Sequence, residues 1–244
     1  MSKLYVVGFG PGGYEHMTVK AVEVIKSVDI VTGYTTYVEM LKAYFPEKTY
    51  LSTPMRKEVD RCRLAVEKTL EGNDVAMVSS GDSGIYGMAG IVLQIVDEMK
   101  ADIEVEVVPG VTAASAAASV LGAPLMHDMT IISLSDLMTP LAQIMKRVEC
   151  AAMGDFVICL YNPKSKKRTD YIYQAAELIL KYQKPDTPVG IVRNACREGQ
   201  SVTLTTLETI READIDMFSI VIVGNSQTYI HDGKMITPRG YTVS

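Results

Sequence analysis

The chain has 244 residues and contains no tryptophan. It has only three histidines and four cysteines. The cysteines are Cys62, Cys150, Cys159 and Cys196, and no two of them are spaced as a C-x-x-C pair. This spacing excludes a zinc ribbon and a thioredoxin-type redox motif. The histidines are scattered along the chain and form no pattern typical of a metal site. We therefore expect free thiols and no bound metal.

Excess positive charge and long apolar runs are also missing. With 24 Lys and Arg against 29 Asp and Glu, the net charge of −5 argues against general nucleic-acid binding. One charge-free run, 107–126, has the length of a membrane span, but its prolines and glycines favour a glycine turn followed by a buried helix. The amino terminus has none of the basic and apolar regions of a signal peptide. We expect a cytoplasmic protein without a membrane partner.

Short apolar runs, each ending in a glycine-rich or polar turn, alternate with amphipathic segments. They predict strands at 4–7, 29–32, 75–78, 103–108, 130–134, 156–160, 189–192, 201–207 and 220–223, and helices at 17–27, 37–44, 58–70, 85–99 and 171–182. The run 103–108 alternates apolar and acidic residues, as a half-exposed edge strand does. This order of elements predicts an α/β fold in both halves of the chain.

Two further sequence features concern domain organisation and surface. Gly122 and Pro124 are helix and strand breakers at a change of composition, so we predict two domains, 1–122 and 125–244. In the predicted helix 58–70, Arg61 and Arg63 belong to a charged face of the kind that is usually exposed to solvent.

The segment 79–90, which follows the strand 75–78, contains four glycines and Asp82. Open α/β sheets bind ligands at the carboxyl ends of their strands, and glycine allows a ligand to approach the backbone closely. Asp82 could accept hydrogen bonds from a ligand there. A tight turn with an N-capping Asp explains the same residues, and the sequence leaves both interpretations open.

The first predicted strand leads into a second glycine loop. Gly8, Gly10 and Gly13 formally satisfy the dinucleotide fingerprint G-x-G-x-x-G. The acid that should end the following strand is missing, because Asp29 begins that strand instead. Pro11 also removes a backbone donor from the turn. These departures argue against a nicotinamide or flavin site.

Polar residues follow other predicted strands. Thr112 and Ser115 stand where a third glycine turn enters a helix, and their hydroxyls could cap this helix or bind a ligand. In the second half, the strand 156–160 is followed by Tyr161 and Asn162. The basic segment 164–168 comes next, and it is either a solvated loop or a contact for an anionic ligand.

The segments 8–12, 81–82 with Tyr86, 109–113 and 160–162 together resemble the tetrapyrrole methyltransferases of cobalamin biosynthesis. The resemblance extends over essentially the whole chain. It implies a class III methyltransferase with two α/β domains and a cofactor cleft between them. S-adenosylmethionine would be the cofactor, S-adenosylhomocysteine its product, and a homodimer the assembly.

Within this family, the segments 84–90, 121–128, 132–137 and 161–165 most resemble the branch that methylates C17 and contracts the macrocycle. This branch implies precorrin-3B or cobalt-factor III as the substrate. Ser83 departs from the family pattern, since many relatives have proline at this position. Serine permits the same turn but makes it less rigid.

The resemblance also implies roles for individual residues. It implies cofactor contacts at Gly10, Pro11, Gly81, Asp82, Ile85, Tyr86, Thr112 and Ala113 in the first half, and at Tyr161, Asn162, Ala195 and Gly224 in the second. A substrate with several carboxylates needs cationic partners, and Lys164, Lys166, Lys167 and Arg168 are the candidates.

Ring contraction requires proton transfers in addition to alkylation. Histidine is a common acid or base in enzymes, so His127 is one candidate, and Asp136 and Ser135 are the others. Four alternatives remain at this point: methylation of another macrocycle position, methylation of a protein side chain as in diphthamide formation, an NAD-dependent oxidoreductase, and a non-catalytic binding protein.

Overall fold

The computed structural model describes residues 2–242, which form two compact units divided between Ala113 and Ala114. Each unit has its own sheet and its own buried core. The two units are described separately below.

The first unit contains a five-stranded sheet in the order β3-β2-β4-β1-β5, and every pair in it is parallel. Its strands are β1 (Lys3–Gly8), β2 (Ile30–Tyr34), β3 (Thr49–Thr53), β4 (Val75–Ser79) and β5 (Glu104–Val108). The edge position of β5 confirms the prediction from its alternating sequence. Because the strands run in one direction, the turns that follow them all lie at the same edge of the sheet.

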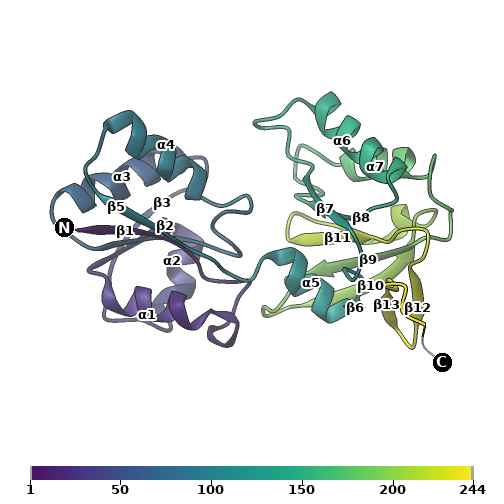
Figure 1. The fold of residues 1–244 in the computed structure, drawn as a ribbon, viewed down its shortest axis with the longest axis horizontal. Helices are drawn as coiled ribbons and strands as arrows, with labels where there is room; N and C mark the ends of the chain where they lie inside the picture. Colours follow the sequence, from purple (N-terminus) through teal and green to yellow (C-terminus); the bar gives the residue numbers. More distant parts are fainter. Residues whose placement is uncertain (1, 243–244) are drawn as a thin grey trace. The chain divides into compact units, whose positions relative to one another are not determined.

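Helices cover both faces of this sheet (Figure 1). They are α1 (Val19–Ser27), α2 (Thr35–Lys42), α3 (Glu58–Leu70) and α4 (Ala89–Met99), with a 3-10 turn at Tyr14–His16. α1 and α2 pack on one face, while α3 and α4 pack on the other. The neighbouring strands β1 and β4 therefore lead to helices on opposite faces. Such a switch point is where open α/β sheets bind ligands.

The second unit contains a mixed five-stranded sheet in the order β10-β9-β11-β8-β7. Its strands are β7 (Met129–Ser133), β8 (Val157–Tyr161), β9 (Pro188–Arg193), β10 (Ser201–Thr206) and β11 (Ser219–Val223). β7 and β8 are parallel, whereas β11 is antiparallel to both β8 and β9. A second sheet consists of β6 (Gly122–Ala123), β12 (Tyr229–His231) and β13 (Lys234–Ile236).

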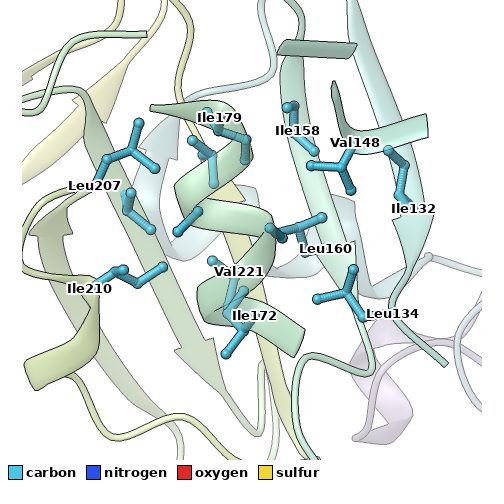
Figure 2. Packing of buried hydrophobic residues seen from close by; sticks show 14 of the residues in the cluster. Ile132, Leu134, Val148, Ile158, Leu160, Ile172, Ile179, Leu207, Ile210 and Val221 are labelled. Carbon is cyan, nitrogen blue, oxygen red and sulfur yellow. The ribbon is translucent and has the colours of Figure 1, made fainter. Parts of the chain in front are cut away.

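The core of the second unit lies between its main sheet and two helices, α6 (Leu141–Met153) and α7 (Tyr171–Ile179). Figure 2 shows α7 with Ile172 and Ile179 among the inward side chains of the strands, including Leu160 and Val221. The short 3-10 helix Ile210–Glu212 adds Ile210 to this cluster. The core thus holds the strand ends of this unit in fixed positions.

The division between the units comes earlier than the boundary expected at Gly122 to Pro124. The cause is helix α5 (Ala113–Leu121), which packs into the second unit. A Cβ atom on Gly190 would lie 2.5 Å from a side-chain carbon of Leu121, so the helix rests directly on β9. The strand β6 that follows α5 pairs with β13.

The charge-free run 107–126 contains the end of β5, a turn, and the helix α5, in which four alanines and a leucine are buried. The prediction of a glycine turn followed by a buried helix is confirmed. Within residues 2–242, no helix has both the length and the apolar character that a membrane crossing requires.

The structure differs from the sequence predictions at three points. α4 begins at Ala89 instead of at residue 85, so residues 85–88 belong to a turn. The strand β3 and the helix α6 were not predicted. Arg61, expected on a solvated helix face, is only 3% exposed.

Two of the four thiols lie in the cores, and this generates a prediction about reactivity. Burial raises the pKa of the Cys62 thiol to about 11 and that of the Cys159 thiol to about 12, whereas Cys150 is exposed. Because thiolates are the reactive form, neither buried thiol should be labelled by an aromatic disulfide at mildly alkaline pH while Cys150 reacts quickly. Denaturant should make all four reactive. Fast labelling of Cys62 or Cys159 in the native protein, seen by peptide mapping, would contradict these core positions.

Candidate functional site

The turns after β1, β4 and β5 touch one another through their backbones. The amide of Gly10 donates to the carbonyl of Gly81 at 3.0 Å, and the amide of Gly81 donates back to Gly10 at 2.7 Å. A Cβ atom on Gly8 would lie 2.7 Å from the oxygen of Gly81, and one on Gly110 would lie 2.2 Å from it. Only glycine fits at these two positions, so the close packing of the three turns depends on them.

The carboxylate of Asp82 links two of these turns. Its Oδ1 accepts hydrogen bonds from the amides of Gly84 at 2.8 Å and Ile85 at 3.1 Å, and its Oδ2 accepts one from Gly110 at 2.9 Å. The Asp82 side chain therefore stabilises the turn after β4 and fastens it to the turn after β5. Since α4 starts four residues after Ile85, this carboxylate closes a turn and does not cap the helix.

Ser83 supplies a second link between the same turns. Its side chain is fully buried, and its hydroxyl donates to the carbonyl of Val108, the last residue of β5, at 3.1 Å. Its carbonyl also accepts from the amide of Ala89 at 2.9 Å. The hydroxyl thus provides a constraint at the position where the family resemblance leads us to expect proline.

The remaining candidates of the first unit surround this packed centre. Gly81 has φ +72°, and a Cβ atom there would be 3.8 Å from the amide nitrogen of Ala113 and 4.0 Å from the Cα of Thr112. The Thr112–Ala113 backbone therefore lies directly beside Gly81. Ile85 and Tyr86 are exposed, at 36% and 55%. Pro11 is buried next to Gly10.

The same geometry argues against a dinucleotide site. The amide and the carbonyl of Gly10 are both used in the pair with Gly81. Residues Tyr14–His16 form a 3-10 turn, and α1 begins only at Val19, so Gly13 does not stand at a helix start. A fingerprint loop needs its helix start at the pyrophosphate, and this loop does not supply one there.

In the second unit, Tyr161 and Asn162 stand at the carboxyl end of β8. The hydroxyl of Tyr161 accepts a hydrogen bond from the amide of Ala114 in the first turn of α5 at 2.8 Å. Asn162 has a left-handed backbone, with φ 51°, and its side-chain amide donates to the hydroxyl of Ser133 at 2.9 Å. The ends of β7 and β8 and the start of α5 are therefore held together.

Ala195 belongs to the same edge of this sheet, because β9 is parallel to β8. The guanidinium of Arg193 donates to Asp216 at 2.7 Å, which ties the end of β9 to the loop before β11. Partial burial opposes ionisation of Asp216, but the hydrogen bonds from Arg193, Phe218 and Ser219 outweigh it and lower the pKa of this carboxyl. The turn that carries Ala195 thus begins from a fixed strand end.

The structure does not bring every candidate to this edge. Gly224 follows β11, which runs in the opposite direction, and its amide donates to the carbonyl of Pro188 at the start of β9. His127 lies before β7, near Asp155 and Ser226 at the same opposite edge. Five residues of β7 separate the two edges, a span of about 13 Å. His127 and Asp136, two of the acid–base candidates, are therefore on opposite edges.

Asp136 lies beyond the carboxyl end of β7 and has two polar neighbours. Its Oδ2 accepts a hydrogen bond from the hydroxyl of Tyr171 at 2.8 Å, and its Oδ1 is 3.8 Å from Nε of Arg168. The hydrogen bond to Asp136 raises the pKa of Tyr171. Together, Asp136 and Tyr171 provide an acceptor and a donor that could move a proton.

The basic segment divides into two kinds of side chain. Lys164 donates to the hydroxyl of Tyr173 at 2.9 Å, and Arg168 donates to the carbonyl of Leu134 at 3.2 Å. These two side chains therefore connect the basic segment to α7 and to the segment after β7. Lys166 and Lys167 are exposed and point their charge into solvent, where an anion can reach them.

The family model of the tetrapyrrole (corrin/porphyrin) methylases matches residues 3–211. The chain belongs to this family. It is 49% identical over 240 residues to a probable cobalt-factor III C(17)-methyltransferase of Salmonella typhimurium, covering 98% of this chain and 100% of the relative.

Two other similarities agree with this result. The chain is 37% identical over 246 residues to a precorrin-3B C(17)-methyltransferase of a Sinorhizobium species, covering 98% of this chain and 96% of that protein. The crystal structure of the methyltransferase CobJ superposes with a TM-score of 0.89 at 32% identity, covering 98% of this chain and 100% of the other. The family resemblance and the α/β fold expected from the sequence are confirmed.

The sequence analysis did not identify Ser133, Tyr171 and Asp216, which lie at the main sheet of the second unit of this tetrapyrrole methylase. Each acts on a partner at least 23 residues away in the chain, so only the fold brings the pair together. A polar residue directly at a strand end, as with Ser133, was the one available signal. The other two stand in a helix start and a loop that composition does not distinguish.

The contact of Gly110 with Gly81 generates a testable prediction. The substitution Gly110→Ala should lower the free energy of unfolding by at least about 2 kcal/mol, because its Cβ would overlap the Gly81 carbonyl. It should also abolish binding of S-adenosylhomocysteine measured by calorimetry. The matched control is Gly90→Ala in α4, where a Cβ meets nothing within 4 Å and should stabilise the helix by about 0.5–1 kcal/mol. Equal stability and binding in both variants would contradict the packing described.

Proposed function

We propose that this tetrapyrrole methylase is an S-adenosylmethionine-dependent C-methyltransferase that acts at C17 of a precorrin-type macrocycle with ring contraction. The observation that carries the proposal is the end-to-end match at 49% identity with a relative named as a cobalt-factor III C(17)-methyltransferase. The relative named for precorrin-3B is less similar, at 37%. We therefore propose cobalt-factor III as the substrate, with precorrin-3B as the alternative.

The cofactor contacts proposed for the first unit are Gly10, Pro11, Gly81, Asp82, Ile85, Tyr86, Thr112 and Ala113. The support is their position at the switch point of the sheet. Gly81 lies beside the Thr112–Ala113 backbone there, and the exposed Ile85 and Tyr86 offer apolar surface to a nucleoside. For the second unit the proposed contacts are Tyr161, Asn162 and Ala195. Gly224 is no longer proposed, since it stands at the opposite edge of its sheet.

The bound cofactor would supply a methyl group on a sulfonium, which transfers to an electron-rich carbon without further activation. The chain's own task is then to orient the macrocycle carbon and to exclude water. The fastened turns around Asp82 and Ser83 suit this task because they hold the backbone in one arrangement. For proton transfer during contraction we propose the pair Asp136 and Tyr171, and we assign no such role to His127.

A single-turnover reaction tests the activity. The protein should transfer one labelled methyl group from S-adenosylmethionine carrying a ¹³C-methyl to cobalt-factor III, and NMR of the product should place the label at C17. A label on another ring carbon would point to a different member of the family. Absence of any transfer, with S-adenosylhomocysteine bound normally, would contradict the proposed substrate.

The division of the basic segment gives a second prediction. Replacing both Lys166 and Lys167 with alanine should weaken binding of the macrocycle about tenfold, because two exposed cations are lost, and should leave the affinity for S-adenosylhomocysteine unchanged. The matched control is Lys181→Ala with Lys184→Ala, two exposed lysines near the end of α7. The assignment is wrong if cofactor affinity falls by the same factor as macrocycle affinity.

We further propose that the protein is a homodimer and that it works in the cytoplasm. The family resemblance supports the dimer. The four free cysteines, two of them buried, are compatible with a reducing compartment. Sedimentation equilibrium of the purified protein tests the assembly, and a monomer at micromolar concentration would contradict it.

A further inference from the structure

A group of buried polar atoms lies toward the carboxyl end of the first sheet, outside the residues proposed for the cofactor. Thr32 Oγ1, Thr53 Oγ1, Ser79 Oγ and Arg61 Nε are buried, and none has a hydrogen-bond partner within the described residues. Buried polar groups are nearly always hydrogen-bonded. Arg61 and Thr53 are in direct contact, so their two unpartnered atoms indicate a shared partner that comes from outside the chain.

The three hydroxyls face the same layer of the unit. Thr32, Thr53 and Ser79 lie on the adjacent strands β2, β3 and β4, and the residue two positions before each packs against α3 and α4. Because side chains alternate along a strand, the hydroxyls share this face. The register pairs Thr53 with Tyr34 and sets Thr32 two residues back, beside Leu51, while Ser79 lies on the other side of β2 from Thr53. Adjacent strands are about 4.8 Å apart, so Thr53 and Ser79 are separated by about 10 Å. Among the three hydroxyls, that of Thr53 belongs to the residue that Arg61 contacts.

Arg61 of α3 is only 3% exposed. Its Nη1 donates to the carbonyl of Thr53 at 3.3 Å, which places the guanidinium at the end of β3. Its Nη2 is 3.7 Å from Oε1 of Glu58, longer than a hydrogen bond, and its Nε has no partner. The Nε–Nη2 edge is the side of a guanidinium that binds a carboxylate through two parallel hydrogen bonds.

Charge argues for an anion here. A buried guanidinium without close compensation is costly, and water would satisfy its hydrogen bonds but not its charge. The Glu58 carboxylate is 40% exposed and offers only partial compensation. Thr53 and Tyr34, which are paired across β2 and β3, are only half-buried and form the open rim of the group. The guanidinium is 5.8 Å from the ring of Tyr34.

We propose that Arg61, with the hydroxyl of Thr53, forms a subsite for a carboxylate group. The inference deepens the proposed function, since a macrocycle with several carboxylate arms would be the source of that group. Arg61 and the Thr53 hydroxyl bind and orient the arm, and they take no part in bond making.

Nitrogen NMR tests the subsite without methyl transfer. The Nε–H signal of Arg61, assigned by its disappearance in Arg61→Lys, should shift saturably when propionate is added, and inorganic phosphate should shift it less. A signal unmoved by propionate and by the macrocycle would mean that waters fill the group and would overturn the inference. A shift with phosphate alone would also overturn it.

Affinity measurements test the connection to the substrate. Arg61→Met should weaken macrocycle binding about tenfold or more and leave S-adenosylhomocysteine binding unchanged. Arg63→Met, which removes a half-exposed guanidinium paired with Glu98, should change neither. Thr53→Val, at the half-buried rim, should weaken macrocycle binding about threefold even if Arg61→Met folds poorly.

If propionate moves the Arg61 signal but no methyl is transferred to the macrocycle, the proposed function fails and the carboxylate subsite remains. Normal macrocycle affinity in folded Arg61→Met and Thr53→Val would show that the arm binds elsewhere.

Discussion

The organisation of the first unit depends on how closely three strand-end turns approach one another. Carbonyl oxygens of Gly8 and Gly81 would stand 2.4 and 2.2 Å from a side chain on Gly110, so these turns can meet only without Cβ atoms. That approach brings backbone amides together, and Asp82 accepts hydrogen bonds from three of them. One carboxylate thereby neutralises a concentration of donors that would otherwise repel one another. The rigid rim that results is what a methyl transfer requires, because alignment and not activation limits the reaction of a sulfonium.

In the second unit, strand direction decides which polar residues can act together. The parallel strands β7, β8 and β9 bring Ser133, Asn162 and Arg193 to one edge, while the antiparallel β11 carries Gly224 to the other. The hydrogen bond between the Tyr161 hydroxyl and the Ala114 amide joins this edge to the start of α5. Candidates that the sequence treats alike, because each follows an apolar run, therefore belong to two different regions.

Local patterns predicted much of the fold and part of the site. The helix 58–70 was predicted with the bounds it has, and the edge position of β5 followed from its alternating acidic residues. The direction of β11 could not be predicted, because a strand buried on both faces has the same sequence pattern in parallel and antiparallel sheets. The burial of Arg61 could not be predicted either. Helical periodicity assigns this residue to the same face as other charged residues, and such a face is usually exposed to solvent. Long-range pairs such as Asp136 with Tyr171 depend on the packing of α7 and have no local signature.

Hydrogen exchange of the complex with S-adenosylhomocysteine tests the central claim, that the cofactor binds where the glycine turns converge. We expect added protection of the amides in 80–86 and 112–114 and of those of Tyr161 and Asn162, with no change in 224–228. Protection confined to 224–228, or to the surface helices, would contradict it.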